Sequence, residues 1–136
     1  MRAIFILLTL GCPFYTWADC SALAENTPDS QFTLKANGAI VRDNKTGLHW
    51  QRCSLGQTWN AVHSRCDPTT TARWFSWQQA LDAASANRLA GFTNWRLPNK
   101  KELASLLELS CSQPAINSRI FPNTAVGRYW TSTPVP

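Results

Sequence analysis

The segment that most constrains the fold is Trp95-Arg96-Leu97-Pro98, which leads directly into Asn99. Pro98 disfavours the helical conformation in the residue before it, so Leu97 is expected to be extended. Asn99 can then cap a new helix, with Glu102 folding back three residues later to complete a capping box. The chain is therefore expected to change from extended to helical at this motif, which makes the motif a structural joint.

The helix after this joint is expected to run from about Lys100 to Leu109. The spacing of Leu103, Leu106 and Leu107 gives it one apolar face. Arg96, just before the helix, is expected to bond backbone carbonyls or a carboxylate of the joint, because a guanidinium carries donors and no acceptor.

An earlier helix is expected to begin at Ser76, where Gln79 completes a second capping box. Gly91 is expected to end it, because glycine readily adopts the left-handed conformation that closes a helix. Apolar residues recur at the spacing of a buried helix face. The residues of this predicted core face are Trp77, Ala80, Leu81 and Ala84.

Short segments with the character of strands precede and follow the two helices. Residues 32–34 and 38–42 are expected to be strands, and 43–47 is rich in turn formers. Residues 48–51 then alternate apolar and polar, so 38–42 and 48–51 are expected to form a β-hairpin. A last strand is expected at 129–133. Strands, two helices, a loop and a strand in this order indicate an α+β fold with segregated elements.

Residues 1–18 have the pattern of a secretory signal peptide. Arg2 gives a positive start, 3–10 is an apolar run, and small residues precede a predicted cleavage site after Ala18. The apolar run is too short to span a bilayer, so no transmembrane anchor is expected. Lipidation at Cys12 is the alternative way in which the chain would be processed.

Residues 19–136 are expected to form a single domain that opens with an irregular tail over 19–31. This part contains four cysteines, and an even number in an exported chain indicates two disulfides, with three possible connectivities. Two of them bracket a long polar loop over 54–73 and are expected to pair and staple it, which leaves the other two for a second bridge. The predicted bridges are Cys53–Cys66 and Cys20–Cys111.

The chain contains seven tryptophans, whose indole rings can fill a core or stack on the apolar faces of sugar rings. Trp59 and Trp74, in or beside the long loop, are the ones expected to be exposed. In the predicted hairpin, Leu48 is expected to face inward and His49 outward. The tryptophans expected to fill the core are Trp50, Trp77, Trp95 and Trp130.

The net charge is +5, and a basic surface can attract anionic glycans, lipid head groups or nucleic acid. The positive residues are scattered, with one adjacent pair at Lys100-Lys101, and export argues against nucleic acid. Loop placement and positive charge select the candidate ligand contacts. They are Trp59, Trp74, Lys100, Lys101, Arg119 and Arg128.

Catalytic and metal chemistry are not expected. A catalytic cysteine needs an activating base, whereas the cysteines are assigned to disulfides. The two histidines lie in different segments, no Cys-x-x-Cys occurs, and no two of the eight acidic residues are adjacent. We therefore predict no metal, no cofactor and no enzymatic activity.

Four blocks of sequence carry a family resemblance. They are Asp43-Asn44-Lys45-Thr46-Gly47-Leu48-His49-Trp50, Ser76-Trp77-Gln78-Gln79-Ala80, Trp95-Arg96-Leu97-Pro98 and Tyr129-Trp130-Thr131-Ser132. In these blocks the chain resembles the Lcl C-terminal domain family, exported bacterial domains with a fold similar to those of C-type lectins and formylglycine-generating enzymes. The resemblance implies a C-type lectin-like domain in which two helices pack on a small antiparallel sheet.

Relatives resembling this chain continue past the last block with a loop and at least one further strand pair, whereas this sequence stops at Pro136. The resemblance therefore implies either a truncated domain with an incomplete sheet or a sheet that is completed differently, and it leaves an open edge at 129–133. An open edge of this kind can pair with a strand of another chain.

The resemblance also implies the function. We expect an exported, non-enzymatic recognition domain, periplasmic or secreted, that binds glycans or other surface polymers in the manner of an adhesin, anionic ones among them. The alternatives are a structural or protein-interaction module that pairs through its open edge, and a truncated fragment without independent function.

Overall fold

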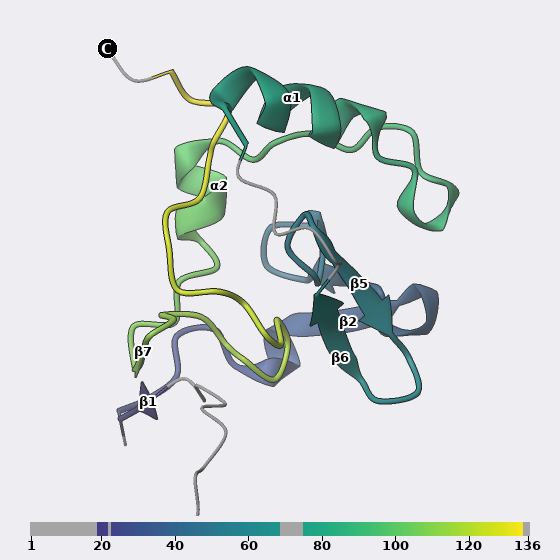
Figure 1. The fold of residues 1–136 in the computed structure, drawn as a ribbon. Coiled ribbons are helices and arrows are strands. Elements are labelled where there is room, and N and C mark those ends of the chain that lie inside the picture. The colour runs from purple at the N-terminus through teal and green to yellow at the C-terminus, as the bar shows by residue number, and fades with distance from the viewer. Residues whose placement is uncertain (1–18, 22, 69–74, 135–136) are drawn as a thin grey trace, which may run out of the picture.

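The computed structural model describes residues 19–21, 23–68 and 75–134. In these ranges the fold is mixed α/β, with small antiparallel sheets and two α-helices (Figure 1). The predicted signal peptide over 1–18 and the candidate contact Trp74 lie outside the described residues. None of the helices within these ranges has the length and apolar character needed to cross a bilayer.

The central sheet contains β2 (Phe32–Lys35), β3 (Ile40–Asp43) and β4 (His49–Gln51), antiparallel and in that order. The β3–β4 pair confirms the predicted hairpin, with Val41 opposite Trp50. Asp43 closes its turn by accepting hydrogen bonds from the Lys45 N–H at 2.9 Å and from the Thr46 hydroxyl at 2.6 Å. β4 is thus an edge strand of this sheet.

Each of the two further sheets is held by a disulfide. Their strands are β1 (Asp19–Cys20) with β7 (Cys111–Ser112) and β5 (Gln57–Asn60) with β6 (Arg65–Pro68). Both predicted bridges, Cys20–Cys111 and Cys53–Cys66, are present. The sequence predicted irregular chain over 19–31 and 54–73. That prediction was wrong for β1, for the 3-10 helix η1 (Asp29–Gln31) and for the β5–β6 hairpin. These segments lack the alternation of apolar residues by which strands are recognised in a sequence, and disulfides and polar contacts hold them.

Helix α1 (Trp77–Ala86) begins behind the predicted capping box of Ser76 and ends at Asn87. The sequence predicted its end at Gly91, which instead ends the short 3-10 helix η3 (Leu89–Gly91) with a φ of 78°. Asn87 leaves the helix because its backbone is extended and its side-chain amide donates to the side-chain oxygen Oε1 of Gln51 at 2.7 Å. That bond fastens the end of α1 to β4.

Helix α2 (Lys100–Ala104) has the predicted cap formed by Asn99 and Glu102, yet it spans five residues and ends well before Leu109. The chain turns after Ala104, so Leu106 and Leu107, which were expected on the helix, lie beyond its end. Leu106 is buried in that turn, whereas Leu107 is 45% exposed and forms an isolated bridge with Ile116. A continuous buried face over this stretch was therefore a wrong prediction.

The C-terminal segment over 129–133 is described and forms no strand, so the predicted strand and its open edge were wrong. The segment runs alongside α2 to the start of α1 (Figure 1). Its backbone bonds a loop, because the Ser132 N–H donates to the Pro98 carbonyl at 2.8 Å. The sheet edge that borders a groove among the described residues is that of β4.

The hydrophobic core lies against the central sheet. Phe32 and Phe121 meet edge to face, with ring centroids 5.8 Å apart. Trp50 and Leu48 are half-buried and His49 is exposed, in the predicted sense. The buried core cluster comprises Phe32, Val41, Leu106, Ile120 and Phe121, with Trp50 and Ile116 packed against it.

Two of the four tryptophans predicted to fill the core lie at the surface. Trp77 is 37% exposed and Trp130 is 48% exposed, while Trp95 is half-buried. The prediction was wrong for Trp77 and Trp130. Residue spacing shows which side chains share a face, but not whether the rest of the chain covers that face, and here it leaves both rings open to solvent. On α1 the buried residues are Ala80 and Ala84.

Candidate functional site

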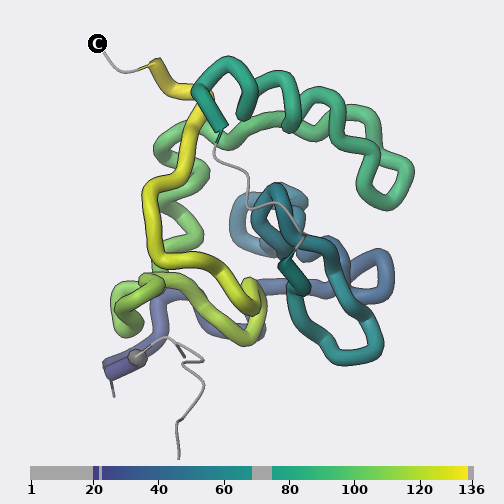
Figure 2. The backbone as a smooth tube through the Cα atoms, viewed as in Figure 1, coloured from purple at the N-terminus to yellow at the C-terminus, as the bar shows by residue number. Residues whose placement is uncertain are grey.

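The C-terminal segment passes the start of α1 (Figure 2). Each of these two segments contains an exposed tryptophan. The Trp77 indole N–H donates to the Thr131 carbonyl at 2.9 Å, and the Trp130 indole N–H donates to the Phe75 carbonyl at 2.7 Å. Each ring is therefore anchored by its nitrogen on the segment that carries the other. We call Trp77 and Trp130 the indole pair.

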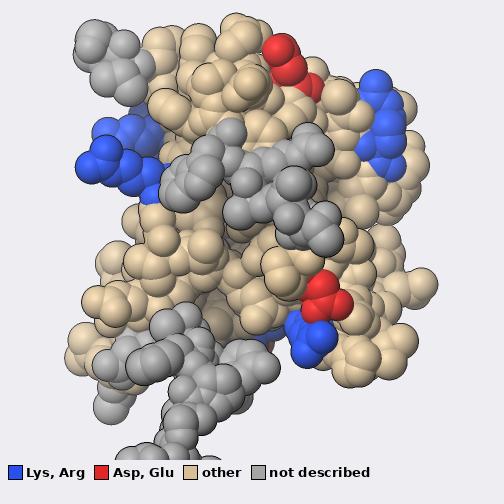
Figure 3. Space-filling view, in the orientation of Figure 1, with Lys and Arg blue, Asp and Glu red and all other residues tan. Residues whose placement is uncertain are grey.

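Basic residues from neighbouring segments accompany the indole pair. The Lys100 N–H donates to the Thr133 hydroxyl at 2.9 Å, which ties the start of α2 to the C-terminal segment. Lys100, Lys101 and Arg128 are exposed. In the view of Figure 3 basic side chains form separate groups rather than one patch, and most of the described surface between them is uncharged. The local charge is therefore positive but modest.

The joint has the geometry that its sequence predicts. Nη1 and Nη2 of Arg96 donate to the two carboxylate oxygens of Glu102 at 2.8 and 2.7 Å. Glu102 also accepts the Asn99 N–H at 2.8 Å, which closes the capping box. The hydrogen bonds from Arg96 and from the Asn99 backbone lower the pKa of Glu102 to about 2. Arg96 thus has its carboxylate partner within the joint.

A groove of about 400 Å³ lies between β4 and the joint. Arg96 and Glu102, which are paired with each other, also line it. The remaining titratable side chain of the lining is His49, whose ring centroid lies 6.2 Å from that of Phe92. The Trp50 indole N–H is buried and has no hydrogen-bond partner in the described part of the chain. The apolar lining residues are Leu48, Trp50, Leu55, Phe92, Trp95 and Leu97. This groove was not predicted from the sequence. It is built from two separate segments, 47–55 and 84–102, whose apolar residues are equally consistent with a place in the core.

Trp59, a candidate ligand contact, is half-buried and takes part in packing. Its indole N–H donates to the Asn37 carbonyl at 2.9 Å, and the Arg52 guanidinium lies 4.3 Å from the ring centroid. Arg52 is 6% exposed and donates to the carbonyls of Gly38 and Ile120, among others. Burial of its guanidinium lowers the pKa of Arg52. This buried arginine was not predicted from the sequence.

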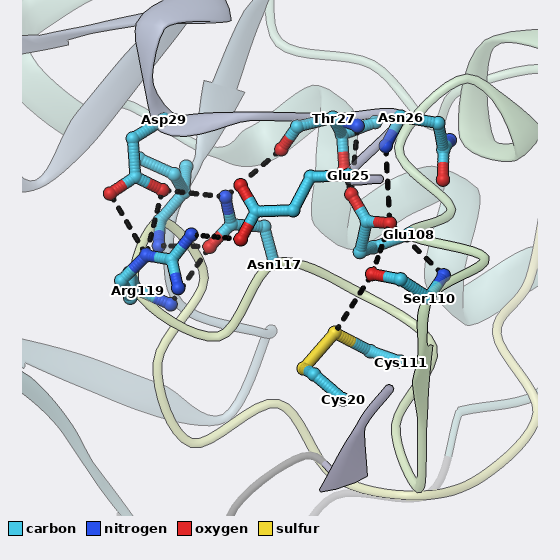
Figure 4. Close-up of polar contacts among 11 residues, drawn as sticks. Cys20, Glu25, Asn26, Thr27, Asp29, Glu108, Ser110, Cys111, Asn117 and Arg119 are labelled. Carbon is cyan, nitrogen blue, oxygen red and sulfur yellow. Dashed lines mark hydrogen bonds and ion pairs between the residues drawn. A yellow bond between two sulfur atoms is a disulfide. The ribbon is translucent and has the colours of Figure 1, made fainter. Parts of the chain in front are cut away.

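Arg119, another candidate contact, is bound to the N-terminal part of the chain (Figure 4). Its Nε donates to both oxygens of Asp29 at 3.0 and 2.9 Å, and its Nη2 donates to Glu25 at 2.6 Å. Asn117 adds bonds to the Thr27 carbonyl at 3.0 Å and to Asp29 at 2.7 Å. The charge of Arg119 is therefore compensated within the chain.

The neighbouring carboxylate of Glu108 is 1% exposed and has only hydrogen-bond donors around it (Figure 4). It accepts from the backbone N–H of Asn26, from the N–H and hydroxyl of Thr27, and from the N–H and hydroxyl of Ser110. Burial acts to raise its pKa, but the bonds from Ser110 and Thr27 outweigh burial and lower the pKa to about 2. Glu108, Arg119 and their partners, with the Cys20–Cys111 bridge, form what we call the N-terminal clasp.

Residues suited to catalysis or metal binding are not gathered in one place in the part of the chain that the structure describes. Within the ranges 19–21, 23–68 and 75–134, no three His, Cys, Asp or Glu side chains are placed to hold a metal ion. The four cysteines of these ranges form disulfides and so offer no thiol. The features that remain for binding are the indole pair and the groove.

The fold and these features define a small, disulfide-bridged α/β domain with two candidate binding surfaces. The family model of the Lcl C-terminal domain matches residues 39–136, and the chain belongs to this family. The matched region includes the central hairpin from β3 onward, both α-helices, the joint and the indole pair. No curated protein and no solved structure matches the chain.

Proposed function

We propose that this chain is an exported, non-enzymatic recognition domain of C-type lectin-like fold that binds glycans or other surface polymers. The observation that carries the proposal is the indole pair, because an indole face open to solvent can stack on the apolar face of a sugar ring. Membership of the Lcl C-terminal domain family supports a role in recognition outside the cell. Two disulfides are consistent with a periplasmic or secreted location.

The anchoring of both rings favours binding. Free surface side chains lose rotamer freedom when a ligand fixes them, and that loss weakens association. Trp77 and Trp130 are already held by bonds to backbone carbonyls, so a ligand meets rings whose orientation is set in advance. Two rings at one crossing of the chain also allow neighbouring sugar units of a polymer to be contacted together.

The charge beside the indole pair favours an anionic polymer. Lys100, Lys101 and Arg128 are exposed and lie in the segments that frame the pair. Arg119 and Trp59 contribute less, because their polar groups already have partners within the chain. The proposed contact set is therefore Trp77, Trp130, Lys100, Lys101 and Arg128.

A titration with dextran sulfate, followed by tryptophan fluorescence, tests the proposal, with uncharged dextran as the matched control. We expect dextran sulfate to change the emission and added salt to weaken the effect, because exposed charges are screened. Trp130→Ala and Trp77→Ala are expected to weaken binding by about tenfold each, which corresponds to a loss of about 1.4 kcal/mol.

A charge-matched variant separates local contacts from net charge. Lys100→Ala is expected to weaken binding more than Lys45→Ala, which removes the same charge from the exposed β3–β4 turn. If the two lysine variants weaken binding equally, the polymer is attracted by net charge alone and not by contacts near the indole pair. An unchanged emission and melting temperature across both dextrans and a panel of neutral and acidic polysaccharides would remove the proposal.

A further inference from the structure

We propose that the outer edge of β4 is a docking site for one extended strand of a partner polypeptide, which lies in the groove between β4 and the joint. The site shares no residue with the indole pair and its basic neighbours, so it does not depend on the proposed binding of glycans. Three observations on this side of the molecule support it: the hydrogen-bonding pattern of β4, the character of the groove and the state of Trp50.

The pairing of β4 with β3 fixes which backbone groups point outward. The Asp43 N–H donates to the Leu48 carbonyl and the Arg52 N–H donates to the Ala39 carbonyl. In an antiparallel ladder, residues alternate between bonding the partner strand and pointing away from it. His49 and Gln51 therefore direct their N–H and C=O groups away from β3, toward the side on which no strand is paired among the described residues.

The row of groups on this edge is specific for a strand. His49 and Gln51 each present one donor and one acceptor, at the spacing of alternate residues in an extended chain. A second strand satisfies both residues at once, which is how peptides add to exposed sheet edges. A sugar or another small molecule has no matching series of alternating amide groups.

The groove beside this edge defines the chemistry of the strand. Its walls are largely apolar, and Arg96 and Glu102 satisfy each other's charge. A charged side chain placed there would lose its hydration without gaining an unpaired opposite charge, which is costly. The docked strand is therefore expected to place uncharged, apolar side chains in the groove.

Trp50 shows that this wall is incompletely satisfied by the described residues. Its buried indole N–H lacks an acceptor. Leaving a buried donor unpaired costs about 1–3 kcal/mol, so an acceptor supplied to this wall would be stabilising. Trp50 lines the groove as well as packing against the core, so the docked strand is expected to supply that acceptor once the ring moves.

The size of the groove favours one strand over a second copy of this domain. A volume of about 400 Å³ lies in the range of pockets that take small ligands and short segments. A second copy would have to bring its own central sheet and joint to β4, and the joint of the first copy stands opposite that edge. A single extended segment meets no such obstacle.

The test uses the full chain and a displayed library of seven-residue peptides, from which the tightest binders are synthesised. Hydrogen exchange then reports the site: a bound peptide is expected to slow exchange of the His49 and Gln51 amides. The Trp50 amide already pairs with Val41 and is expected to change little. A copy of the peptide methylated at alternate backbone nitrogens is expected to bind at least about tenfold more weakly when the methyl groups face β4, a difference of about 1.4 kcal/mol.

A pair of protein variants completes the test. Leu55→Asp places a carboxylate in the groove from a loop position that is 37% exposed, and is expected to weaken peptide binding by about tenfold or more because apolar side chains of the peptide would have to desolvate that charge. Val62→Asp, at a position 88% exposed between β5 and β6, is the control and should bind as the unchanged chain does.

Several outcomes would overturn the docking site. These are a library that yields no binder, a bound peptide that leaves the His49 and Gln51 amides unprotected, and methylated peptides that bind as tightly as the parent. A self-association that protects the same amides without peptide would assign the edge to a second copy instead. Protection of these amides by dextran sulfate would assign the groove to a glycan.

Discussion

The N-terminal clasp and the region around the groove differ in how fully their polar groups are satisfied. In the clasp, Glu108 is buried with donors on both sides, and Arg119 has two carboxylate partners. In the groove, the Trp50 indole N–H has no partner among the described residues. The indole pair, a separate surface, is open to solvent. Both regions contain capped, hydrogen-bonded segments, so secondary structure alone does not separate them.

This difference teaches where stability and recognition lie in the domain. Fully satisfied polar networks rigidify the part of a protein that contains them. Binding surfaces keep apolar area and hydrogen-bonding groups that await a partner, and they tend to belong to less stable regions. We therefore assign most of the stability to the clasp and the core beside it, and recognition to the groove and the indole pair.

The largest expected effect comes from removing the Cys20–Cys111 bridge with Cys20→Ser and Cys111→Ser together. This bridge closes a loop of 91 residues, and cross-links over such lengths stabilise by about 4–5 kcal/mol in the chain-entropy description. Denaturant unfolding followed by circular dichroism measures the loss. The matched variant lacks the Cys53–Cys66 bridge, whose separation of 13 residues predicts a smaller loss of about 3 kcal/mol. A larger loss of unfolding free energy on removal of the Cys53–Cys66 bridge would place the stability in the β5–β6 hairpin and contradict its assignment to the clasp.

Glu108→Gln is expected to destabilise the domain by about 2–4 kcal/mol, because the amide brings donor hydrogens toward the donors of Thr27 and Ser110. The folded-state pKa of Glu108 is depressed from 4.5 to about 2. Its contribution is therefore complete above pH about 4.5 and is lost as the pH falls toward 2. Melting temperatures between pH 2 and pH 7 measure this loss, which should be reduced in Glu108→Gln.

Glu102→Gln is the control for this pH dependence. Glu102 has a pKa depressed to the same value, but it lies at the joint and is partly exposed. Its replacement is expected to cost about 1 kcal/mol or less and to leave most of the acid-induced loss in place. An equal or larger effect of Glu102→Gln would move the main acid-sensitive site from the clasp to the joint.

A smaller effect is expected at the boundary between the two regions, where Trp59 packs beneath Arg52. Gly38 has a φ of +84°, and a Cβ there would lie 2.8 Å from the Trp59 ring. Gly47 has a φ of +76° with no atom within 4 Å of the equivalent position. Both Gly→Ala variants carry the backbone strain of about 1 kcal/mol, and Gly38→Ala is expected to cost about 1 kcal/mol more through the close contact. Equal unfolding free energies would show that the Arg52–Trp59 stack yields freely.

Local chemistry made the joint and the caps predictable from sequence. Pro98 and Asn99 act on their immediate neighbours, so the extended-to-helical change and the capping box follow from adjacent residues. The disulfides followed from the parity and spacing of four cysteines. The family resemblance was also carried by these local blocks, and the match over residues 39–136 confirms it.

Long-range contacts account for what the sequence did not predict. Glu108 lies within the helix predicted from about Lys100 to Leu109, whereas its partners Asn26 and Thr27 lie more than eighty positions away. Spacing suggested that Trp77 and Trp130 face a core, but spacing does not show which side of an element the rest of the chain covers. The predicted strand over 129–133 is absent for a similar reason. The Ser132 N–H of this segment donates to the carbonyl of Pro98 in a loop, and not to a neighbouring strand.

Native-state hydrogen exchange tests the division of the domain most directly. The amides of Thr27 and Ser110, which donate to buried Glu108, are expected to exchange only through global unfolding. The amides of α1, such as that of Ala80 bonded to the Ser76 carbonyl, are expected to exchange through a local opening of lower free energy. Amides of α1 that exchange as slowly as those of Thr27 and Ser110 would contradict a domain whose stability is concentrated in the clasp.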